Sequence, residues 1–359
     1  MKKQDSKGET ETRLRSVADL VGAGLVADAQ AARIERVGQA FAVGLTDTVQ
    51  SLIDRDDPND PIARQFIPDP AELEFQPEEL TDPIGDHAFS PVEGIVHRYP
   101  DRVLLKILHV CAVYCRFCFR REMVGPSAAS QLSPEALEAA FSYIDANRQI
   151  WEVILTGGDP MVMSLRRLEQ VFLRLGSMNH VKIIRIHTRV PCVEPSRITP
   201  RLVDLLRGTG KTVFVALHAN HPRELTAEAR AACGLMIDAG IPMVSQTVLL
   251  RGVNDNVETL AALMRVLVET RIQPYYLHHP DLARGTAHFR LTIEEGQALV
   301  RALQGSLSGL CQPRYVLDIP GGYGKAPIGP SYIAGQEGAY RIADYQGRMH
   351  SYPPKPTGG

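Results

Sequence analysis

Three of the six cysteines in this chain of 359 residues lie close together, at Cys111, Cys115 and Cys118. They follow an apolar run, 103–109, that has the composition of a β-strand. Three thiolates can bind three irons of a four-iron cluster and leave the fourth iron without a protein ligand, whereas electron-transfer clusters usually have four cysteine ligands. The spacing therefore predicts a cluster whose open iron chelates a small molecule and takes part in chemistry.

Two other uses of cysteine fit this chain less well. Structural zinc sites typically pair two short Cys/His knuckles, whereas Cys192, Cys233 and Cys311 each stand alone. A disulfide framework is typical of short secreted chains, and Met1-Lys-Lys-Gln-Asp5 does not begin a signal peptide. Iron bound by thiolates indicates a reducing compartment, so we expect a cytoplasmic protein.

A second reactive group stands in the stretch 321–325, Gly-Gly-Tyr-Gly-Lys. Glycines adopt backbone conformations that other residues avoid, and Lys325 could act as a Schiff-base nucleophile. The stretch is not a P-loop, because G-x-x-x-x-G-K-[ST] is not satisfied and Ala326 stands in place of the hydroxyl residue. A lone glycine-rich stretch with a lysine is ordinarily a solvated turn. Its position in the fold must therefore indicate whether Lys325 has a function.

From residue 103 onward, short apolar runs alternate six times with segments of helical period. Ser133-Pro134 is typical of a helix start, and Gly176 and Gly240 are typical of helix ends. The alternation predicts an α/β fold with a parallel sheet covered by helices. Six units and a seventh strand fall short of an eight-unit barrel, so we predict a partial (β/α)6 TIM-like barrel rather than a flat doubly wound sheet. The expected strands are 103–109, 151–155, 181–187, 212–217, 243–250, 273–278 and 314–319, and the expected helices are 134–147, 164–175, 199–207, 225–239, 257–270 and 292–304.

The polar clusters of the chain follow these strands. In parallel βα barrels, functional residues come from the carboxyl ends of the strands. Random placement would scatter polar clusters over both ends, so their common position predicts one functional rim. The clusters are the three cysteines after the first strand, Thr156–Pro160 after the second, His187–Arg189 after the third, His218 at the end of the fourth, Gln246 in the fifth, Asp281 after the sixth, and Asp318 with Lys325 after the seventh.

Three charged residues on this rim suit a particular ligand. Arg120, two residues beyond Cys118, offers a planar fork that pairs with a carboxylate. Asp281 and Asp318 come from neighbouring strand ends, and two carboxylates at one site suit an ammonium group. Taken singly, the arginine could belong to a basic surface run, and each aspartate could be a loop residue or a helix cap.

The segments before and after this core differ from it in composition. Residues 12–53 have helical period, whereas 54–91 contain repeated Asp-Pro turns that predict an extended arm. Residues 340–359 are expected to fray. We therefore predict an N-terminal helical and extended arm at 1–100, a core barrel at 101–305, and a C-terminal segment at 306–359 that carries the lysine loop.

Composition narrows the class of protein. The apolar content of 44% supports a substantial core, and the net charge of −2 gives no general reason to expect nucleic acid or an anionic membrane as partner. No stretch approaches the roughly 20 consecutive apolar residues of a membrane helix. We expect a soluble protein.

The cysteine spacing, C-x3-C-x2-C, is the signature of the radical S-adenosylmethionine (SAM) enzymes, which this chain resembles. The stretch 318–325, Asp-Ile-Pro-Gly-Gly-Tyr-Gly-Lys, closely resembles the pyridoxal phosphate (PLP) lysine loop of the lysine 2,3-aminomutase family. Agreement with that family runs from His97 to Lys325, about two thirds of the chain. Further matching blocks are 97–102, 189–191, 218–222, 248–255 and 274–281.

This resemblance implies a 4Fe-4S cluster on the three cysteines, SAM on its open iron, and PLP on Lys325. An electron from a flavodoxin- or ferredoxin-type donor would cleave SAM, and the radical formed would take a hydrogen from the substrate while the amino group moves. The implied cofactor contacts are Gly157, Gly158 and Asp159 for the amino group of SAM, Arg98, Tyr99 and Lys325 for PLP, and His218 and Gln246 near both groups.

By the same resemblance, Arg120 would bind the carboxylate of a free amino acid, and Asp281 and Asp318 would bind the ε-ammonium of lysine. The implied activity is an isomerase that moves the α-amino group of L-lysine to the β-carbon. Alternatives are a β-lysine-forming enzyme for the modification of elongation factor P, an aminomutase for another amino acid, a radical SAM enzyme without PLP, and a non-catalytic iron–sulfur protein.

The chain departs from the longer family members in one respect. Those members bind structural zinc with C-terminal cysteines and a cysteine after the Arg-Gly-Val-Asn-Asp block, where this chain has Asn256. No cysteine follows Cys311, so we expect this short form to lack that zinc. Relatives that serve elongation factor P share the short form but diverge in the loop where this chain keeps Asp318.

Overall fold

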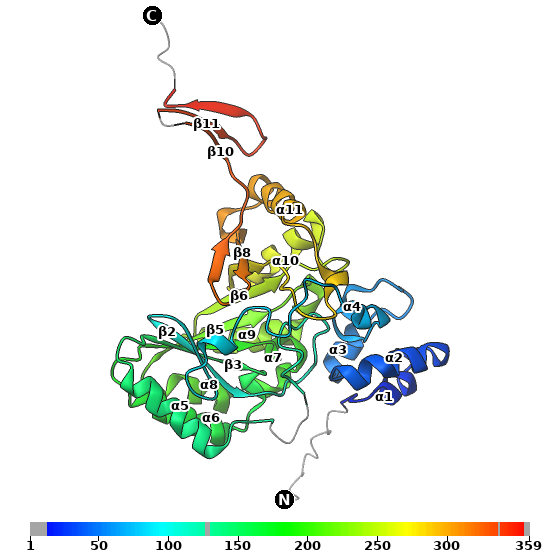
Figure 1. Ribbon diagram of the computed structural model, residues 1–359, viewed down its shortest axis with the longest axis vertical. Helices are drawn as coiled ribbons and strands as arrows, with labels where there is room; N and C mark the ends of the chain where they lie inside the picture. Colours follow the sequence, from blue (N-terminus) through cyan, green and yellow to red (C-terminus); the bar gives the residue numbers. More distant parts are fainter. Residues whose placement is uncertain (1–12, 126–129, 337, 355–359) are drawn as a thin grey trace, which may run out of the picture.

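A nine-stranded sheet forms the centre of the computed structural model, which describes residues 13–125, 130–336 and 338–354 (Figure 1). Its strands lie in sequence order from β1 to β9, β2 to β8 are parallel, and β1 and β9 are antiparallel edge strands. A doubly wound sheet would reverse its strand order, so the predicted barrel-like α/β fold is confirmed. The strands are β1 (Ile95–Tyr99), β2 (Arg102–Leu108), β3 (Glu152–Gly157), β4 (Ile183–Thr188), β5 (Thr212–His218), β6 (Met243–Val248), β7 (Gln273–His278), β8 (Arg314–Ile319) and β9 (Gly324–Pro327).

Helices link the parallel strands, and the predicted strands and helices are found with boundaries within two residues. The side chain of Ser133 accepts the backbone N–H of Ala136, as its place before Pro134 predicted. Neighbouring helices contact one another around the outside, α6 with α8 and α10 with α11 (Figure 1). The main helices are α5 (Pro134–Ala146), α6 (Leu165–Gly176), α8 (Pro200–Arg207), α9 (Ala227–Asp238), α10 (Val257–Glu269) and α11 (Ile293–Ser306).

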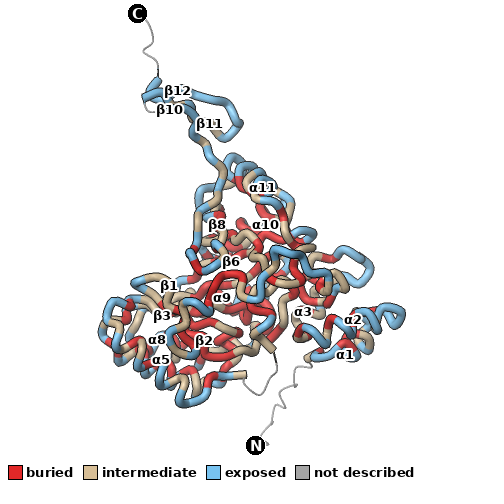
Figure 2. Tube along the Cα trace, in the orientation of Figure 1, coloured by how far each residue is buried: buried red, intermediate tan, exposed pale blue. Residues whose placement is uncertain are grey.

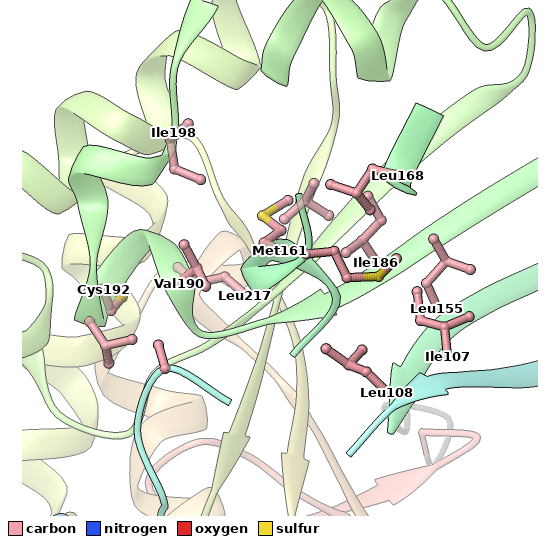
Figure 3. Packing of buried hydrophobic residues seen from close by; sticks show 14 of the residues in the cluster. Ile107, Leu108, Leu155, Met161, Leu168, Ile186, Val190, Cys192, Ile198 and Leu217 are labelled. Atoms are coloured by element: carbon pink, nitrogen blue, oxygen red, sulfur yellow. The ribbon is translucent and has the colours of Figure 1, made fainter. Parts of the chain in front are cut away.

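The core lies between the sheet and the inner faces of these helices (Figure 2). Helix α6 buries Leu168, Val171, Phe172 and Leu175, whose spacing of three and four residues places them on one helix face. Figure 3 shows part of this packing, in which Leu168 lies near Ile186 of β4. Full burial of each such side chain contributes about 1.5–3 kcal/mol to stability, so the core holds the carboxyl ends of the strands in place.

The two edges of the sheet meet without pairing as strands. The backbone N–H of Lys325 in β9 donates to the hydroxyl of Tyr99 in β1, with 2.8 Å between nitrogen and oxygen. Gly324 has a φ of +91°, and a Cβ at this position would lie 2.7 Å from the Tyr99 hydroxyl oxygen. The barrel is therefore nearly closed, and the closure places Lys325 beside β1.

The N-terminal segment has more regular structure than its composition predicted. The helical character of 12–53 is confirmed from residue 13 onward, and residue 12 lies outside the described ranges. Short helices interrupt 54–91, where an extended arm was predicted, because Asp60 and Asp69 each cap a helix that starts with proline. These elements are α1 (Val17–Gly22), α2 (Asp28–Ala40), α3 (Asp47–Leu52), α4 (Pro61–Phe66) and the 3₁₀ helices η1 (Pro70–Leu73) and η2 (His87–Phe89).

The prediction of a frayed tail from residue 340 is wrong for 340–352, and 355–359 lie outside the described ranges. Three antiparallel strands, β10 (Ile333–Gln336), β11 (Ala339–Ala343) and β12 (Met349–Tyr352), form a small exposed sheet that projects from the barrel (Figures 1 and 2). The carboxylate of Asp344 accepts the backbone N–H groups of Gln346 and Arg348 and thereby fixes the turn between β11 and β12.

The predicted division at residues 100 and 305 stays a prediction. Strand β1 lies in the predicted arm, and β8 and β9 lie in the predicted C-terminal segment, yet all three belong to the central sheet. None of the helices in the described ranges has the length and apolar character needed to cross a membrane.

We expect Gly324→Ala to lower the free energy of unfolding by about 1–3 kcal/mol, because a side chain there would require a strained left-handed backbone beside Tyr99. Urea denaturation measures the change. Gly329→Ala is the matched control, since no atom lies within 4 Å of a Cβ at that position. Equal stability of the two variants would contradict the proposed closure.

Candidate active site

The three predicted cluster cysteines lie in the loop that follows β2, at the carboxyl edge of the sheet. Their thiols are free and partly buried, and all three line one small cavity whose other walls include Phe41 and Ala42. Burial, together with the neighbouring Cys115, raises the pKa of Cys118 to about 11. Metal ligation requires the thiolate form, so binding of metal here must displace protons.

Across 13–125, 130–336 and 338–354, no three His, Cys, Asp or Glu side chains are grouped closely enough to hold one metal ion. The expected absence of structural zinc stays a prediction.

A buried carboxylate from the N-terminal segment holds this loop. Glu72 of η1 is fully buried and accepts two hydrogen bonds from Arg116, at 2.6 Å from Nη2 and 2.9 Å from Nε, and one from Arg121. Burial raises the pKa of Glu72, but the two guanidinium groups outweigh it and hold that pKa below its usual value. Arg116 directly follows Cys115 and Arg121 lies three residues after Cys118, so Glu72 holds the loop at two points. Only the Asp69-to-Glu72 capping pattern marks Glu72 in the sequence.

The predicted glycines at the end of β3 pack against the chain that leads into the cysteines. Gly158 N–H donates to Leu108 O at 2.6 Å, and a Cβ on Gly158 would lie 2.1 Å from Val110 O. Gly157 has a φ of +105°, which favours glycine. The glycines therefore pack closely against the backbone directly beside the cysteine loop, and their contact with the amino group of SAM stays a prediction.

Asp159 is buried and joins the ends of β3 and β4. Its carboxylate accepts the Thr188 hydroxyl and the Arg189 backbone N–H, both at 2.7 Å. Burial raises the pKa of Asp159 above its usual value. The carboxylate therefore fixes the position of the Gly-Gly-Asp stretch relative to β4.

Two of the predicted cofactor residues are neighbours inside the barrel. His218 at the end of β5 is in register with Gln246 of β6, and His218 Nε2 lies 3.0 Å from Gln246 Oε1. Gln246 Nε2 also lies 3.4 Å from Nε2 of His187. Burial lowers the pKa of His218 to about 4 and the pKa of His187 well below its usual value. At neutral pH this wall is polar and uncharged.

The predicted lysine lies against one of the predicted aspartates. Lys325 of β9 is in register with Asp318 of β8, and their side chains form an ion pair. Arg98 of β1 contributes a second positive charge, with Nη1 3.9 Å from Asp318 Oδ1. That Oδ1 atom is buried and has no hydrogen-bond partner among the described residues. Asp318 therefore has capacity for another donor.

Asp281 lies after β7, next to this group. Burial raises the pKa of Asp281 to about 7, and the carboxylate of Asp318 is the second cause. A cation placed beside the two carboxylates would favour the ionised form of Asp281. That both aspartates bind one ligand stays a prediction.

Arg120, the predicted carboxylate-binding residue, is buried rather than part of a basic surface run. Its Nη2 donates to Asp86 Oδ2 at 3.0 Å, and Arg98 Nη2 lies 3.3 Å from Asp86 Oδ1. Lys106 Nζ lies 3.8 Å from the same carboxylate. Asp86 comes from the N-terminal segment and belongs to no motif, so it was not among the predicted site residues. It holds three cations at one edge of the site.

Comparison with known proteins now decides the family. The sequence model of the radical SAM superfamily matches residues 105–264, and the one described as lysine-2,3-aminomutase matches residues 300–357. L-lysine 2,3-aminomutase of Clostridium subterminale is 43% identical over 298 residues, which cover 83% of this chain and 71% of that protein. The chain belongs to the lysine 2,3-aminomutase family of radical SAM enzymes.

Other family members match most of this chain at lower identity. L-lysine 2,3-aminomutase of Fusobacterium nucleatum is 39% identical over 96% of this chain and 81% of that protein. Glutamate 2,3-aminomutase of Clostridioides difficile is 33% identical over 90% of this chain and 76% of that protein. As a member of the lysine 2,3-aminomutase family, the protein is an enzyme of the isomerase class, and its radical SAM domain implies a 4Fe-4S cluster and SAM.

Asn256 stands where longer members of the lysine 2,3-aminomutase family were expected to have a cysteine. Asn256 caps α10, and its side chain accepts the backbone N–H of Thr259 at 2.8 Å. Asparagine is among the preferred residues at helix starts. The residue therefore has a local structural role.

We expect anaerobically reconstituted protein to bind about four irons per chain and Cys115→Ala to lose iron and SAM cleavage, because the described structure offers no other cysteine beside this loop. Iron analysis and detection of 5'-deoxyadenosine measure the two effects. Cys233→Ala is the control, since Cys233 is buried in α9 and should keep both properties. Full iron content with intact SAM cleavage in Cys115→Ala would refute the assignment of the loop.

Proposed function

We propose that this enzyme converts L-lysine into β-lysine by moving the α-amino group to the β-carbon, with a 4Fe-4S cluster, SAM and PLP as cofactors. The relatives named L-lysine 2,3-aminomutase support the reaction. The observation that carries the choice of lysine is the pair of carboxylates at Asp281 and Asp318, beside the lysine loop.

Asp318 already binds a lysine ammonium, that of Lys325. The other oxygen of this carboxylate, Oδ1, is buried and has no hydrogen-bond partner among the described residues, so it can accept a second ammonium. Asp281, whose pKa is raised to about 7, would gain a cationic partner from the same bound group. A lysine side chain supplies such a cation, because its ε-ammonium has three donors and one positive charge.

A glutamate substrate fits this end of the site poorly. Its side-chain carboxylate would add a third negative charge beside Asp281 and Asp318, and like charges at close range disfavour the ionised forms. One relative is named a glutamate 2,3-aminomutase, so membership of the family alone does not select the substrate. The paired aspartates favour lysine.

The residues present fit the proposed cofactors. Three cysteines line one cavity beside the Gly-Gly-Asp stretch. The backbone N–H of Lys325 donates to Tyr99, and the Lys325 amine and Arg98 both lie against the Asp318 carboxylate. The Arg98 Nε has no hydrogen-bond partner among the described residues and can donate to an anionic group. When bound, the cluster and SAM supply a carbon radical that removes hydrogen, and PLP makes the amino group able to migrate.

The side chains of this enzyme would position the substrate between two charged ends. We assign the α-carboxylate to Arg120, whose guanidinium is already oriented by Asp86. The ε-ammonium belongs to Asp281 and Asp318 at the other end. Binding at both ends fixes the β-carbon, and a misplacement of about 1 Å can cost on the order of a hundredfold in rate.

We expect Asp281→Asn and Asp318→Asn each to lower kcat/KM for lysine about tenfold or more, since a charged hydrogen bond is worth ~1.5–3 kcal/mol. SAM cleavage and PLP binding should remain largely intact. Anaerobic assays that separate β-amino acids by chromatography measure the effect, with lysine, arginine and glutamate offered in turn.

Arg120→Lys is the control for these variants. It keeps the charge but loses the planar fork, so it should impair all α-amino acid substrates alike. Normal turnover of lysine by both aspartate variants, or a preference of the wild-type enzyme for glutamate, would refute the choice of lysine while leaving radical aminomutase chemistry in place.

The pH dependence gives a further prediction. Asp281 binds a cation only when ionised, and its raised pKa of about 7 means that the ionised form is lost as the pH falls through 7. We therefore expect kcat/KM for lysine to be level above pH 8 and to fall as the pH drops below 7, toward the level of Asp281→Asn, whose side chain is uncharged like the protonated acid. Asp281→Asn should remove this fall. An unchanged pH profile in that variant would show that another group is responsible.

A further inference from the structure

Arg189 donates a hydrogen bond to a cluster cysteine. Its Nη1 lies 3.0 Å from Cys115 Sγ. Among the side-chain hydrogen bonds of the described residues, this is the one that reaches a sulfur of the three cysteines. The side chain of Arg189 is only 7% exposed. The contact therefore lies in a water-poor environment, where a charged hydrogen bond is strong.

The guanidinium of Arg189 cannot easily turn away from the sulfur. Its Nη2 donates to Glu224 Oε2 at 2.6 Å and to Gln65 Oε1 at 2.5 Å. The group also lies over the rings of Phe66 and Phe117, with 4.7 Å and 5.4 Å between the guanidinium carbon and the ring centroids. One terminal nitrogen is thus fixed by two acceptors, which leaves the other directed at the sulfur.

The backbone of Arg189 is fixed as firmly as its side chain. Its N–H donates to Asp159 Oδ2 at 2.7 Å. The helix that follows, α7 (Val190–Val193), is buried throughout, and Figure 3 labels Val190 and Cys192 within the core. Arg189 therefore connects the cysteine loop to the Gly-Gly-Asp stretch through rigid groups.

Glu224 balances the charge of Arg189. The Oε1 atom of Glu224 accepts the backbone N–H groups of Asn220 and His221, both at 2.9 Å, while Oε2 accepts Arg189. The carboxylate and the guanidinium together carry no net charge, so the pair changes little in the overall charge near the cysteines. Its specific effect is the hydrogen bond to the Cys115 sulfur.

We infer that Arg189 sets the reduction potential of the cluster by donating this hydrogen bond to the Cys115 thiolate. The inference rests on the proposed cluster. One electron, from a one-electron protein reductant or from dithionite in an assay, takes the core from 2+ to 1+ and the core with three thiolates from −1 to −2. Hydrogen bonds to cluster sulfurs stabilise the more negative state and raise the potential. Arg189 thereby makes the cluster easier to reduce.

Arg189→Lys tests the inference, because a compact ammonium cannot bind Glu224, Gln65 and the sulfur together as the guanidinium does. At a fixed potential we expect the ratio of reduced to oxidised cluster to fall on the order of tenfold, which is about 59 mV for a one-electron couple. A redox titration of SAM-free protein, followed by electron paramagnetic resonance, measures the shift.

Arg197→Lys is the matched control. Arg197 follows the same strand and donates to the carbonyl groups of Met161 and Val162, at 3.2 Å and 2.9 Å, without contacting a cluster sulfur. The cluster of the Arg197→Lys variant should have the same reduction potential as the cluster of the wild type. An Arg189→Lys variant that holds four irons at the wild-type potential would overturn the inference, and the proposed cluster would stand.

A measurement on the wild-type enzyme covers the case in which Arg189→Lys loses iron. Protein labelled with ¹⁵N only in the guanidinium groups of arginine should show a nitrogen coupling to the reduced cluster in pulsed electron paramagnetic resonance, which Arg197→Lys retains. Absence of that coupling in the wild type, or its persistence at full strength in Arg189→Lys, would overturn the inference. A wild-type protein that binds no cluster after reconstitution would instead refute the proposed function.

Discussion

The curvature of the central sheet is the constraint on which the site depends. Because the strands lie in sequence order, β2 to β8 present their carboxyl ends on one rim, and the edge strands β1 and β9 approach each other. The hydrogen bond from Lys325 to Tyr99 joins these edges, although the two residues are separated by 226 positions. A flat sheet would place them at opposite sides of the molecule. Closure therefore brings the lysine loop to β1, which pairs with the strand that leads into the cysteines.

Buried carboxylates provide a second level of organisation. Glu72 holds Arg116 and Arg121, Asp86 holds Arg120 with Arg98 and Lys106, and Glu224 holds Arg189. A buried arginine without a charged partner would destabilise the fold, because its charge is removed from water. Each carboxylate therefore allows a buried cation to be placed at the site. Glu72 and Asp86 come from the N-terminal segment. That segment thus supplies charges that the barrel strands do not carry.

Similarity to known proteins establishes the class of reaction, whereas the charged side chains of the site bear on the choice of substrate. Family membership establishes a radical SAM isomerase, and relatives named for lysine and for glutamate both match the chain at 33% identity or more. Under the proposed function, the paired carboxylates of Asp281 and Asp318 would distinguish these substrates by charge. The choice of substrate would then depend on electrostatics at one end of the barrel, and radical formation would take place at the cysteine end.

Much of this protein was determined by local sequence alone. The alternation of apolar runs and helical segments predicted the barrel, and the positions of Cys111, Asp281 and Lys325 relative to strands predicted one rim, because parallel strands place their carboxyl ends together. The Asp-Pro stretches and the tail were misread for a physical reason. An aspartate before a proline can stop one element and also cap the next, and short strands in the tail are stabilised by pairing that sequence periodicity does not reveal.

Only the tertiary structure decided which charges meet. Glu72, Asp86 and Glu224 carry no catalytic motif, yet each orients an arginine at the site. The contact between Arg189 and Cys115 likewise joins residues 74 positions apart. Such partners depend on the relative placement of separate elements and on the energetic requirement that buried charges be paired. Residue type and spacing specify the chemistry available to the chain, and three-dimensional packing specifies the electrostatic setting in which it acts.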